Sequence, residues 1–272
     1  MSASGVIEED YGLVAVLDAL GTRGTRSPEE WRRLMERRSR ILADARSTPG
    51  FRQGFFSLEP ADSDKDVPSF DVKPAVLGFS DTLLLTFSIK PIQAEPAFIL
   101  RAACRWLSGW YIRAILDGDL YRGAVSIGTF YRSGEIVAGN PVNDAGSLHE
   151  LADWAGVIVT PATACQLRPD LMPNSPFQYY RWDVPLHPKP DGSVDTQNLW
   201  TLSWPARSQI ISDDLSASRL WPSVEAIFDR SSRADVVRKK RNTKQYFDAV
   251  WNRALELRRA GEEKASRVTG LS

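Results

Sequence analysis

The chain has 272 residues, 43% apolar and 25% charged, an ordinary composition for a globular protein. Its 34 basic and 34 acidic side chains balance, which excludes a strong overall field that would attract nucleic acid or an anionic membrane. Cys104 and Cys165 are too few for a disulfide framework or a zinc cluster. There is no signal-peptide pattern and no apolar run of membrane-spanning length. We therefore expect a cytoplasmic protein that binds neither nucleic acid nor a membrane.

The first predicted elements are a buried strand and an amphipathic helix. Residues 11–17 form an apolar run that predicts a strand ended by Asp18. The segment SPEE provides an N-cap, a first-turn proline and two acids, so it predicts a helix over residues 27–46. Residues 47–69 are rich in Pro, Ser and Asp and predict a loop, with a short strand at residues 55–56.

A hairpin is predicted next. Residues 74–87 (PAVLGFSDTLLLTF) predict two apolar strands with Ser80 and Asp81 at their turn. If this hairpin lies beside the first strand, Asp18 and Asp81 meet at one sheet edge. Such oxygen ligands suit Mg²⁺ or Mn²⁺, with nucleotide phosphates completing the shell, which would make a nucleotidyl-transfer site. The alternative is that each aspartate only solvates a loop.

The remaining pattern alternates helices and strands. Helices are predicted at residues 94–116, 142–152, 161–167, 221–228 and 233–259, and strands at 122–127, 134–137, 156–159, 177–182 and 199–204. The order β-α-β-β-α-β is that of the ferredoxin-like fold. We therefore expect an α+β palm with an antiparallel sheet and helices on one face.

Two parts of the chain are expected to differ in role. Residues 1–205 would form the catalytic domain, and residues 206–272 a helical extension that packs on or near it. Because the last helix is strongly charged, we expect it to be peripheral.

Five segments, in this order, resemble the motifs of the class III nucleotidyl cyclases, the catalytic domain of adenylate and guanylate cyclases. They are VLDALGT (16–22), FSD (79–81), RGAVSIG (122–128), GNPVNDAGS (139–147) and ADWAGVIV (152–159). The resemblance extends over residues 10–165 and implies the palm fold of this family. In the second segment, Ser80 stands where the family has glycine.

The resemblance implies a two-metal site. Asp18, Asp81 and the backbone carbonyl of Ala19 would hold two Mn²⁺ or Mg²⁺ ions, which would activate the ribose 3′-hydroxyl and neutralise the triphosphate. Attack of the 3′-oxygen on the α-phosphorus would release pyrophosphate. The backbone N–H groups of Ala19, Leu20, Gly21 and Thr22 would hold phosphate oxygens.

The resemblance also implies a head-to-tail homodimer with shared active sites. In the family, each site takes its aspartates from one subunit and an asparagine, here Asn143, from the other. Asn143 would lie near the ribose and α-phosphate; without the resemblance, it could equally be a helix N-cap or first-turn amide. We expect Arg122 to brace the sheet, and we expect no catalytic role for His149 or His187.

Three departures from the family stand out. Ser147 occupies the position of the transition-state arginine, so either an arginine comes from elsewhere, with Arg23, Arg26 and Arg132 as candidates, or catalysis is weaker. Leu77 and Ile136 occupy the positions of the purine-reading lysine and aspartate, and apolar groups there give adenine no hydrogen-bond partners. The phosphate-binding lysine has equivalents in RKKRNTKQYF (238–247), of which we select Lys244, although a solvated basic helix also fits.

These departures resemble one branch, the bacterial pyrimidine cyclases of the Pycsar antiphage system, which share the FSD hairpin, the AGNPVN-type turn and the RNT element (241–243). This resemblance implies synthesis of cyclic UMP, or cyclic CMP, from UTP or CTP, and a separate effector that senses the product. Of these two nucleotides, we expect UTP to be the substrate. The alternatives are a purine cyclase, a non-catalytic cyclase-homology domain, or a diguanylate cyclase. The serine at position 147, in place of the family's arginine, favours the non-catalytic domain. The predicted hairpin lacks the Gly-Gly-Asp/Glu-Glu-Phe signature of diguanylate cyclases.

Overall fold

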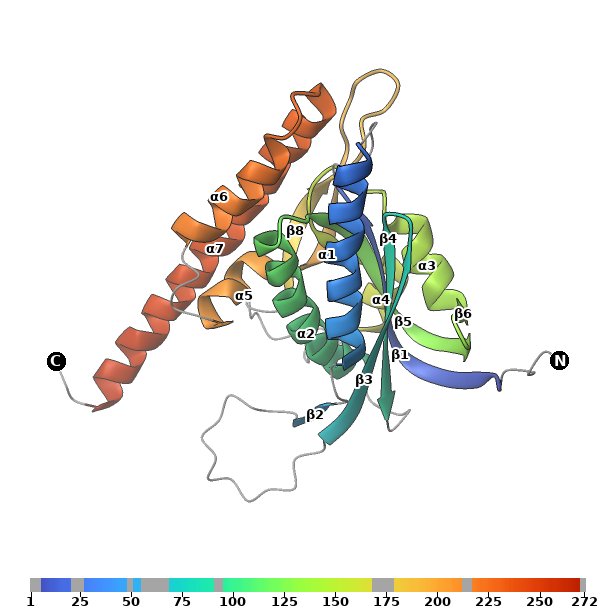
Figure 1. Ribbon diagram of the computed structural model, residues 1–272. Helices are drawn as coiled ribbons and strands as arrows, with labels where there is room; N and C mark the ends of the chain where they lie inside the picture. The colour runs from blue at the N-terminus through green and yellow to red at the C-terminus, as the bar shows by residue number, and fades with distance from the viewer. Residues whose placement is uncertain are drawn as a thin grey trace.

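The computed structural model describes residues 6–20, 27–47, 51–54, 69–90, 95–167, 179–211 and 217–269. Within these residues, the strands are β1 (Glu8–Ala19), β2 (Phe51–Gly54), β3 (Ser69–Phe79), β4 (Thr82–Lys90), β5 (Tyr121–Ser133), β6 (Ile136–Ala138), β7 (Val157–Val159), β8 (Tyr179–Pro185) and β9 (Thr196–Leu202). The helices are α1 (Pro28–Ser47), α2 (Pro96–Leu116), α3 (Asn140–Leu148), α4 (Pro161–Gln166), α5 (Trp204–Ile211), α6 (Ala217–Phe228) and α7 (Ala234–Thr269). Figure 1 shows their arrangement.

The described strands form one mixed, mostly antiparallel sheet, so the chain is an α+β protein. The strand order is β2-β3-β4-β1-β5-β7-β9-β8, with β6 paired to β5. Only β5 and β7 pair in parallel among the pairs within the described residues. The elements β1, α1, β3, β4, α2 and β5 follow the predicted β-α-β-β-α-β order, with the short β2 added before β3.

Strand β1 lies in the middle of the sheet, antiparallel to both β4 and β5. Its residues from Gly12 to Ala19 are all buried, which explains why the sequence shows a continuous apolar run instead of alternation. The predicted hairpin is confirmed as β3 and β4, with Ser80 and Asp81 at the turn.

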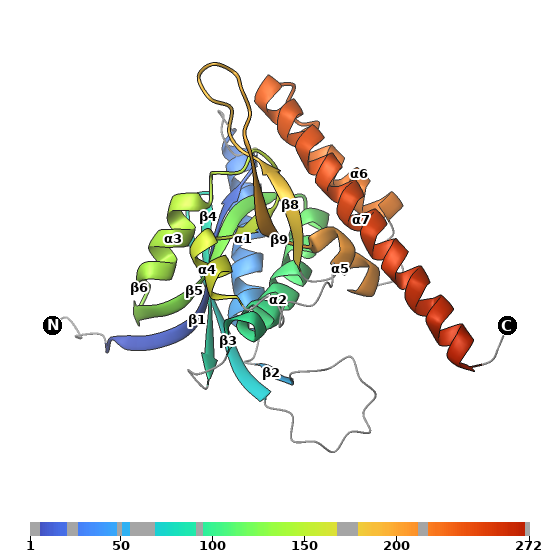
Figure 2. The same cartoon turned by 180° about the vertical axis from the view of Figure 1, so that it is seen from behind.

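Helices cover both faces of the sheet. Helices α1 and α2 lie on one face, and α3 and α4 on the other (Figures 1 and 2). On β5, Tyr121 contacts the ring of Trp110 in α2, whereas Ser126, of opposite parity, bonds Asp144 in α3. The expectation of helices on one face is therefore wrong. The parallel pair β5 and β7 needs a crossover, and α3 lies in that connection.

Helix α7 was expected to be peripheral, but it packs against the core. Figure 2 shows it running past the β8 end of the sheet, beside α5 and α6. The ring of Tyr246 lies 4.1 Å from that of Trp154 and 5.8 Å from that of Trp182. Tyr246, Phe247, Val250 and Ala254 are all buried, so one face of this charged helix belongs to the hydrophobic core.

Most other predicted elements are present, but some end later than predicted: β5 runs to Ser133 instead of residue 127, and α7 runs to Thr269 instead of residue 259. Helix α3 ends at Leu148, earlier than predicted. Helix α5 was not predicted, because its first residues continue the apolar run of β9. The strand predicted at residues 55–56 lies outside the described residues.

The close approach of β5 to β1 depends on Gly123. A Cβ added there would lie 2.2 Å from the Val16 carbonyl oxygen and 3.0 Å from the Leu17 Cα, so the backbone would have to move. We expect Gly123→Ala to lower the free energy of unfolding by about 2 kcal/mol or more, measured by urea denaturation. Gly146 in α3 is the matched control, because a Cβ there meets nothing within 4 Å. Gly146→Ala is expected to stabilise the fold by about 0.5–1 kcal/mol. Equal stability of the two variants would contradict this packing.

Candidate functional site

Asp18 and Asp81 come together at the end of β1. Asp18 is buried and faces Thr82 of β4 on one side and Arg122 of β5 on the other. The neighbouring N–H of Ala19 donates to the Asp81 carbonyl over 2.9 Å, which ties the β3–β4 turn to β1. The predicted meeting of the two aspartates is thus observed in the backbone pairing.

The two carboxylates also influence each other electrostatically. Burial raises the pKa of Asp18, the negative charge of Asp81 raises it further, and the Arg122 guanidinium only partly offsets these effects. Two negative charges held close together in a partly dry site repel each other. A cation between them would relieve this repulsion.

The turn that carries Asp81 holds Ser80 in a left-handed conformation, with φ 52°. This conformation costs a side-chain-bearing residue about 1–2 kcal/mol and costs glycine little. The strained serine thus lies directly before Asp81 in the turn between β3 and β4.

Replacing Ser80 with glycine is expected to raise the free energy of unfolding. The gain is about 0.5–1 kcal/mol, because the greater freedom of glycine in the unfolded chain offsets part of the relieved strain. Ser80→Ala is the control, since it keeps the Cβ and therefore the strain. Thermal unfolding of both variants measures the difference, and a glycine variant less stable than the alanine variant would rule out strain at this turn.

Arg122 braces Asp18 from β5. Its Nε and Nη2 donate to Oδ2 of Asp18 over 3.4 and 3.3 Å. It also donates to the side chain of Glu150 over 3.0 Å and to the Glu150 carbonyl over 3.3 Å. Since Arg122 is buried, it fixes Asp18 against the segment that follows α3.

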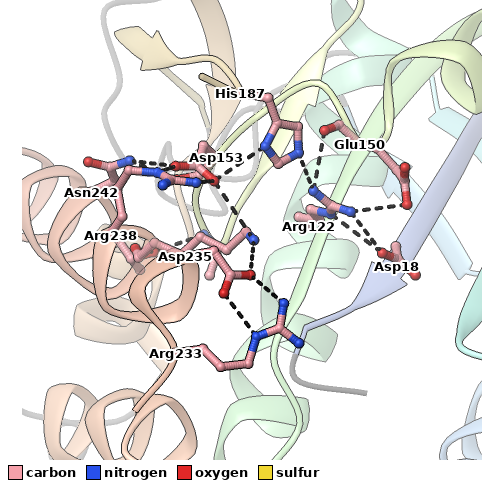
Figure 3. Close-up of polar contacts among 12 residues, drawn as sticks. Asp18, Arg122, Glu150, Asp153, His187, Arg233, Asp235, Arg238 and Asn242 are labelled. Carbon is pink, nitrogen blue, oxygen red and sulfur yellow. Dashed lines mark hydrogen bonds and ion pairs between the residues drawn. The ribbon is translucent and has the colours of Figure 1, made fainter. Parts of the chain in front are cut away.

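His187 extends this contact toward the C-terminal helices (Figure 3). Its Nε2 lies 2.7 Å from Nη1 of Arg122, and its Nδ1 lies 3.4 Å from Oδ1 of Asp153. Because a guanidinium can only donate, Nε2 accepts and the ring proton is on Nδ1, facing Asp153. A polar chain therefore runs from Asp18 through Arg122 and His187 to Asp153.

Asp153 anchors α7. Its carboxylate pairs with Arg238 and lies 3.8 Å from Nζ of Lys239, and its carbonyl accepts from the Asn242 amide over 2.8 Å. Thr243 accepts from the N–H of Ala155 over 2.8 Å. The RNT element (241–243) thus supplies two buried side chains that attach α7 to the segment before β7.

Sequence reasoning missed Glu150, Asp153 and His187 as partners in this network. Burial raises the pKa of Asp153, but hydrogen bonds from His187 and Arg238 and the charges of Arg238 and Lys239 outweigh it, and the pKa falls to about 2. A carboxyl with a lowered folded pKa stabilises the fold above its unfolded pKa of about 3.9, and the effect disappears as the pH falls through the folded pKa.

The Asp153 charge is expected to stabilise the protein in a defined pH window. Asp153→Asn should lower the free energy of unfolding by about 2 kcal/mol above about pH 5, and the gap to the wild type should shrink as the pH falls from about 4 to about 2. Urea denaturation at several pH values measures this gap. Asp183→Asn, at an exposed aspartate of β8, is the control and should show no such gap. A constant gap at all pH values would contradict the charge network.

The predicted phosphate-binding loop needs a correction. The N–H of Ala19 donates to the Asp81 carbonyl, and the N–H of Leu20 donates to the Leu120 carbonyl over 2.7 Å. Both groups are used within the fold, so neither is available to hold phosphate as the sequence suggested. Gly21 and Thr22 lie outside the described residues.

Three further predicted site residues lie on β3, β6 and α3. Leu77 is half-buried on β3 and pairs with Leu84, and Ile136 is 70% exposed on β6. Asn143 is exposed on α3. The adjacent Asp144 bonds Ser126, four residues along β5 from Arg122, which is roughly 13 Å at ~3.3 Å per residue.

The basic candidates are also placed elsewhere. Lys244 pairs with Asp248 over 2.6 Å and lies over the ring of Trp221. Arg132 pairs with Glu8 and Asp10, near the start of β1 and far along the strand from Asp18. Ser147 donates to the Asp144 carbonyl over 2.9 Å. Arg23 and Arg26 lie outside the described residues.

The chain matches no protein-family model and no curated protein. In the part of the chain that the structure describes, no group of three or more His, Cys, Asp or Glu side chains is placed to hold a metal ion. No described helix is both long enough and apolar enough to cross a membrane.

Proposed function

We propose that the chain is a metal-dependent pyrimidine nucleotide cyclase that converts UTP, or CTP, into a 3′,5′-cyclic nucleotide and pyrophosphate. The observation that carries this proposal is the meeting of Asp18 and Asp81, from distant segments, at the end of β1. The order of the five motifs and the β-α-β-β-α-β arrangement of the core support it. The fold proposed is accordingly that of the class III cyclases.

The donor set fits Mn²⁺ or Mg²⁺. Asp18, Asp81 and the Ala19 carbonyl offer hard oxygen ligands, and the nucleotide phosphates supply the rest of the shell. When bound, the ions provide Lewis-acid activation of the 3′-hydroxyl and charge neutralisation. The two hydrogen bonds from Arg122 to Asp18 both go to Oδ2. Arg122 therefore orients the Asp18 carboxylate and leaves its Oδ1 to act as a metal ligand.

A second copy of the chain completes the proposed site. Asn143 is exposed on α3, and the adjacent Asp144 bonds Ser126, four residues along β5 from the Arg122 that faces Asp18. In a head-to-tail homodimer, Asn143 of one subunit would face the aspartates of the other. It would then position the ribose and α-phosphate for in-line attack by the 3′-oxygen.

The proposed substrate follows from the absence of hydrogen-bonding side chains at the two positions that would contact a purine base. Leu77 and Ile136 offer no hydrogen bonds to adenine or guanine, so such a site does not favour purines. A pyrimidine cyclase of this kind would act in the bacterial cytoplasm, in antiphage defence, through a separate effector that binds the cyclic product. UTP is preferred over CTP, and a purine cyclase is the alternative within the same reaction class.

A second function, nucleotide binding without turnover, is favoured by one observation. Ser147 stands where the family has its transition-state arginine, and it bonds within its own helix. A non-catalytic cyclase-homology domain would bind the nucleoside triphosphate in calorimetry and release no cyclic product. Turnover by the purified chain excludes this function.

The metal site is tested by Asp81→Asn. The purified protein with Mn²⁺ is incubated with each of the four nucleoside triphosphates, and the products are identified by mass spectrometry. We expect cyclic UMP or cyclic CMP from the wild type and at least a roughly 100-fold lower rate from Asp81→Asn, because one metal carboxylate is lost. Asp191→Asn, in the exposed turn between β8 and β9, is the matched control and should keep full activity. No cyclic product from any nucleotide would exclude the cyclase.

A further inference from the structure

A cavity of about 170 Å³ opens directly beside Asp18. It lies between the ends of β1 and β5, helix α1 and the turn from α6 to α7. Its volume is that of several water molecules. Because Asp18 and Ala19 form part of its wall, the cavity adjoins two of the proposed metal ligands.

The cavity is positively charged. Its lining includes five basic side chains and three acidic ones: Arg37, Arg122, Arg230, Arg233 and Lys239 against Asp18, Asp119 and Asp235. The basic residues come from α1, β5, the α6–α7 turn and α7, so the charge is gathered from distant parts of the sequence. An excess of positive charge in a partly enclosed site favours an anionic ligand.

Two of these arginines have donors that the fold leaves unused. The Nε of Arg37 is buried and has no hydrogen-bond partner among the described residues, although the same side chain pairs with Asp119. Arg230 donates from Nη1 to the Gly118 carbonyl over 3.1 Å, and no described carboxylate lies within ion-pair distance of it. By contrast, Arg233 and Lys239 are both paired with Asp235.

We propose that this cavity holds the polyphosphate chain of the nucleotide, with Arg37 and Arg230 donating to its oxygens. This inference deepens the proposed function and rests on it for the identity of the nucleotide. It gives the phosphate-binding role to arginines of α1 and the α6–α7 turn, since Lys244 is held by Asp248 away from the cavity lining. Guanidinium groups suit this role because they bond phosphate oxygens at more than one nitrogen.

The test uses inorganic tripolyphosphate and the full chain without added metal. Isothermal titration calorimetry is expected to show that the wild type binds tripolyphosphate. The affinity of Arg230→Gln should be lower by a factor of about ten or more, because one charge-assisted contact is lost. Arg230 is exposed and makes a single described bond, so the variant keeps the fold. Arg253→Gln is the matched control: it removes the same charge from an exposed position on α7. No binding by the wild type, or equal weakening in both variants, overturns the proposal.

Competition then identifies the source of the polyphosphate. UTP with Mn²⁺ is expected to displace tripolyphosphate, and simultaneous binding of both would overturn the assignment to the nucleotide. This inference fails alone if cyclic product forms while Arg230→Gln binds tripolyphosphate and UTP like the wild type. The cyclase proposal fails alone if tripolyphosphate binds as expected, UTP displaces it, and no triphosphate is cyclised.

Discussion

Strand β1 lies between β4 and β5, and this position determines the surroundings of Asp18. The antiparallel pairing with β4 places the Asp81 turn beside it, and the pairing with β5 places Arg122 opposite it. Both pairings require close backbone contact, which Gly12 permits against Phe87 of β4 and Gly123 permits against Val16 of β1. Burial and the charge of Asp81 then make the negative form of Asp18 costly, and this cost is what a bound cation would remove.

The same end of the sheet is connected to the C-terminal helices. Arg122 contacts Asp18, Glu150 and His187, and His187 faces the buried Asp153, which holds α7 through Arg238 and Asn242. The residues after 205 are therefore not an independent appendage in this structure. They contribute a buried face to the core and part of the wall of the cavity beside Asp18.

The central strand, the hairpin and the first two long helices could be predicted because their signals are local. Residues 11–17 and 74–87 are unbroken apolar runs, and Ser27 with Pro28 marks the start of α1. The meeting of Asp18 and Asp81 was predicted on the condition that the hairpin lies beside the first strand, and the pairing of β1 with β4 meets that condition. Helix α7 was misjudged because its charge outweighed a periodic signal that is visible in the sequence, the apolar residues Tyr246, Phe247, Val250 and Ala254.

The rest of the site depends on contacts that no local pattern contains. His187 meets Arg122 across 65 residues, and Asn242 meets Asp153 across 89. The sequence suggested that the N–H of Leu20 could bind phosphate, but this N–H donates to the carbonyl of Leu120. Likewise, a run of basic residues identifies a charged helix face but not which member, Lys239 or Lys244, lines a cavity.

The most direct measurement is a crystal structure of the protein with Mn²⁺ and a non-cyclisable UTP analogue, with manganese located by anomalous scattering. Manganese between the carboxylates of Asp18 and Asp81, with the nucleotide phosphates in the same shell, is the predicted result. A bound nucleotide with no manganese at these two aspartates would contradict the proposed two-metal site.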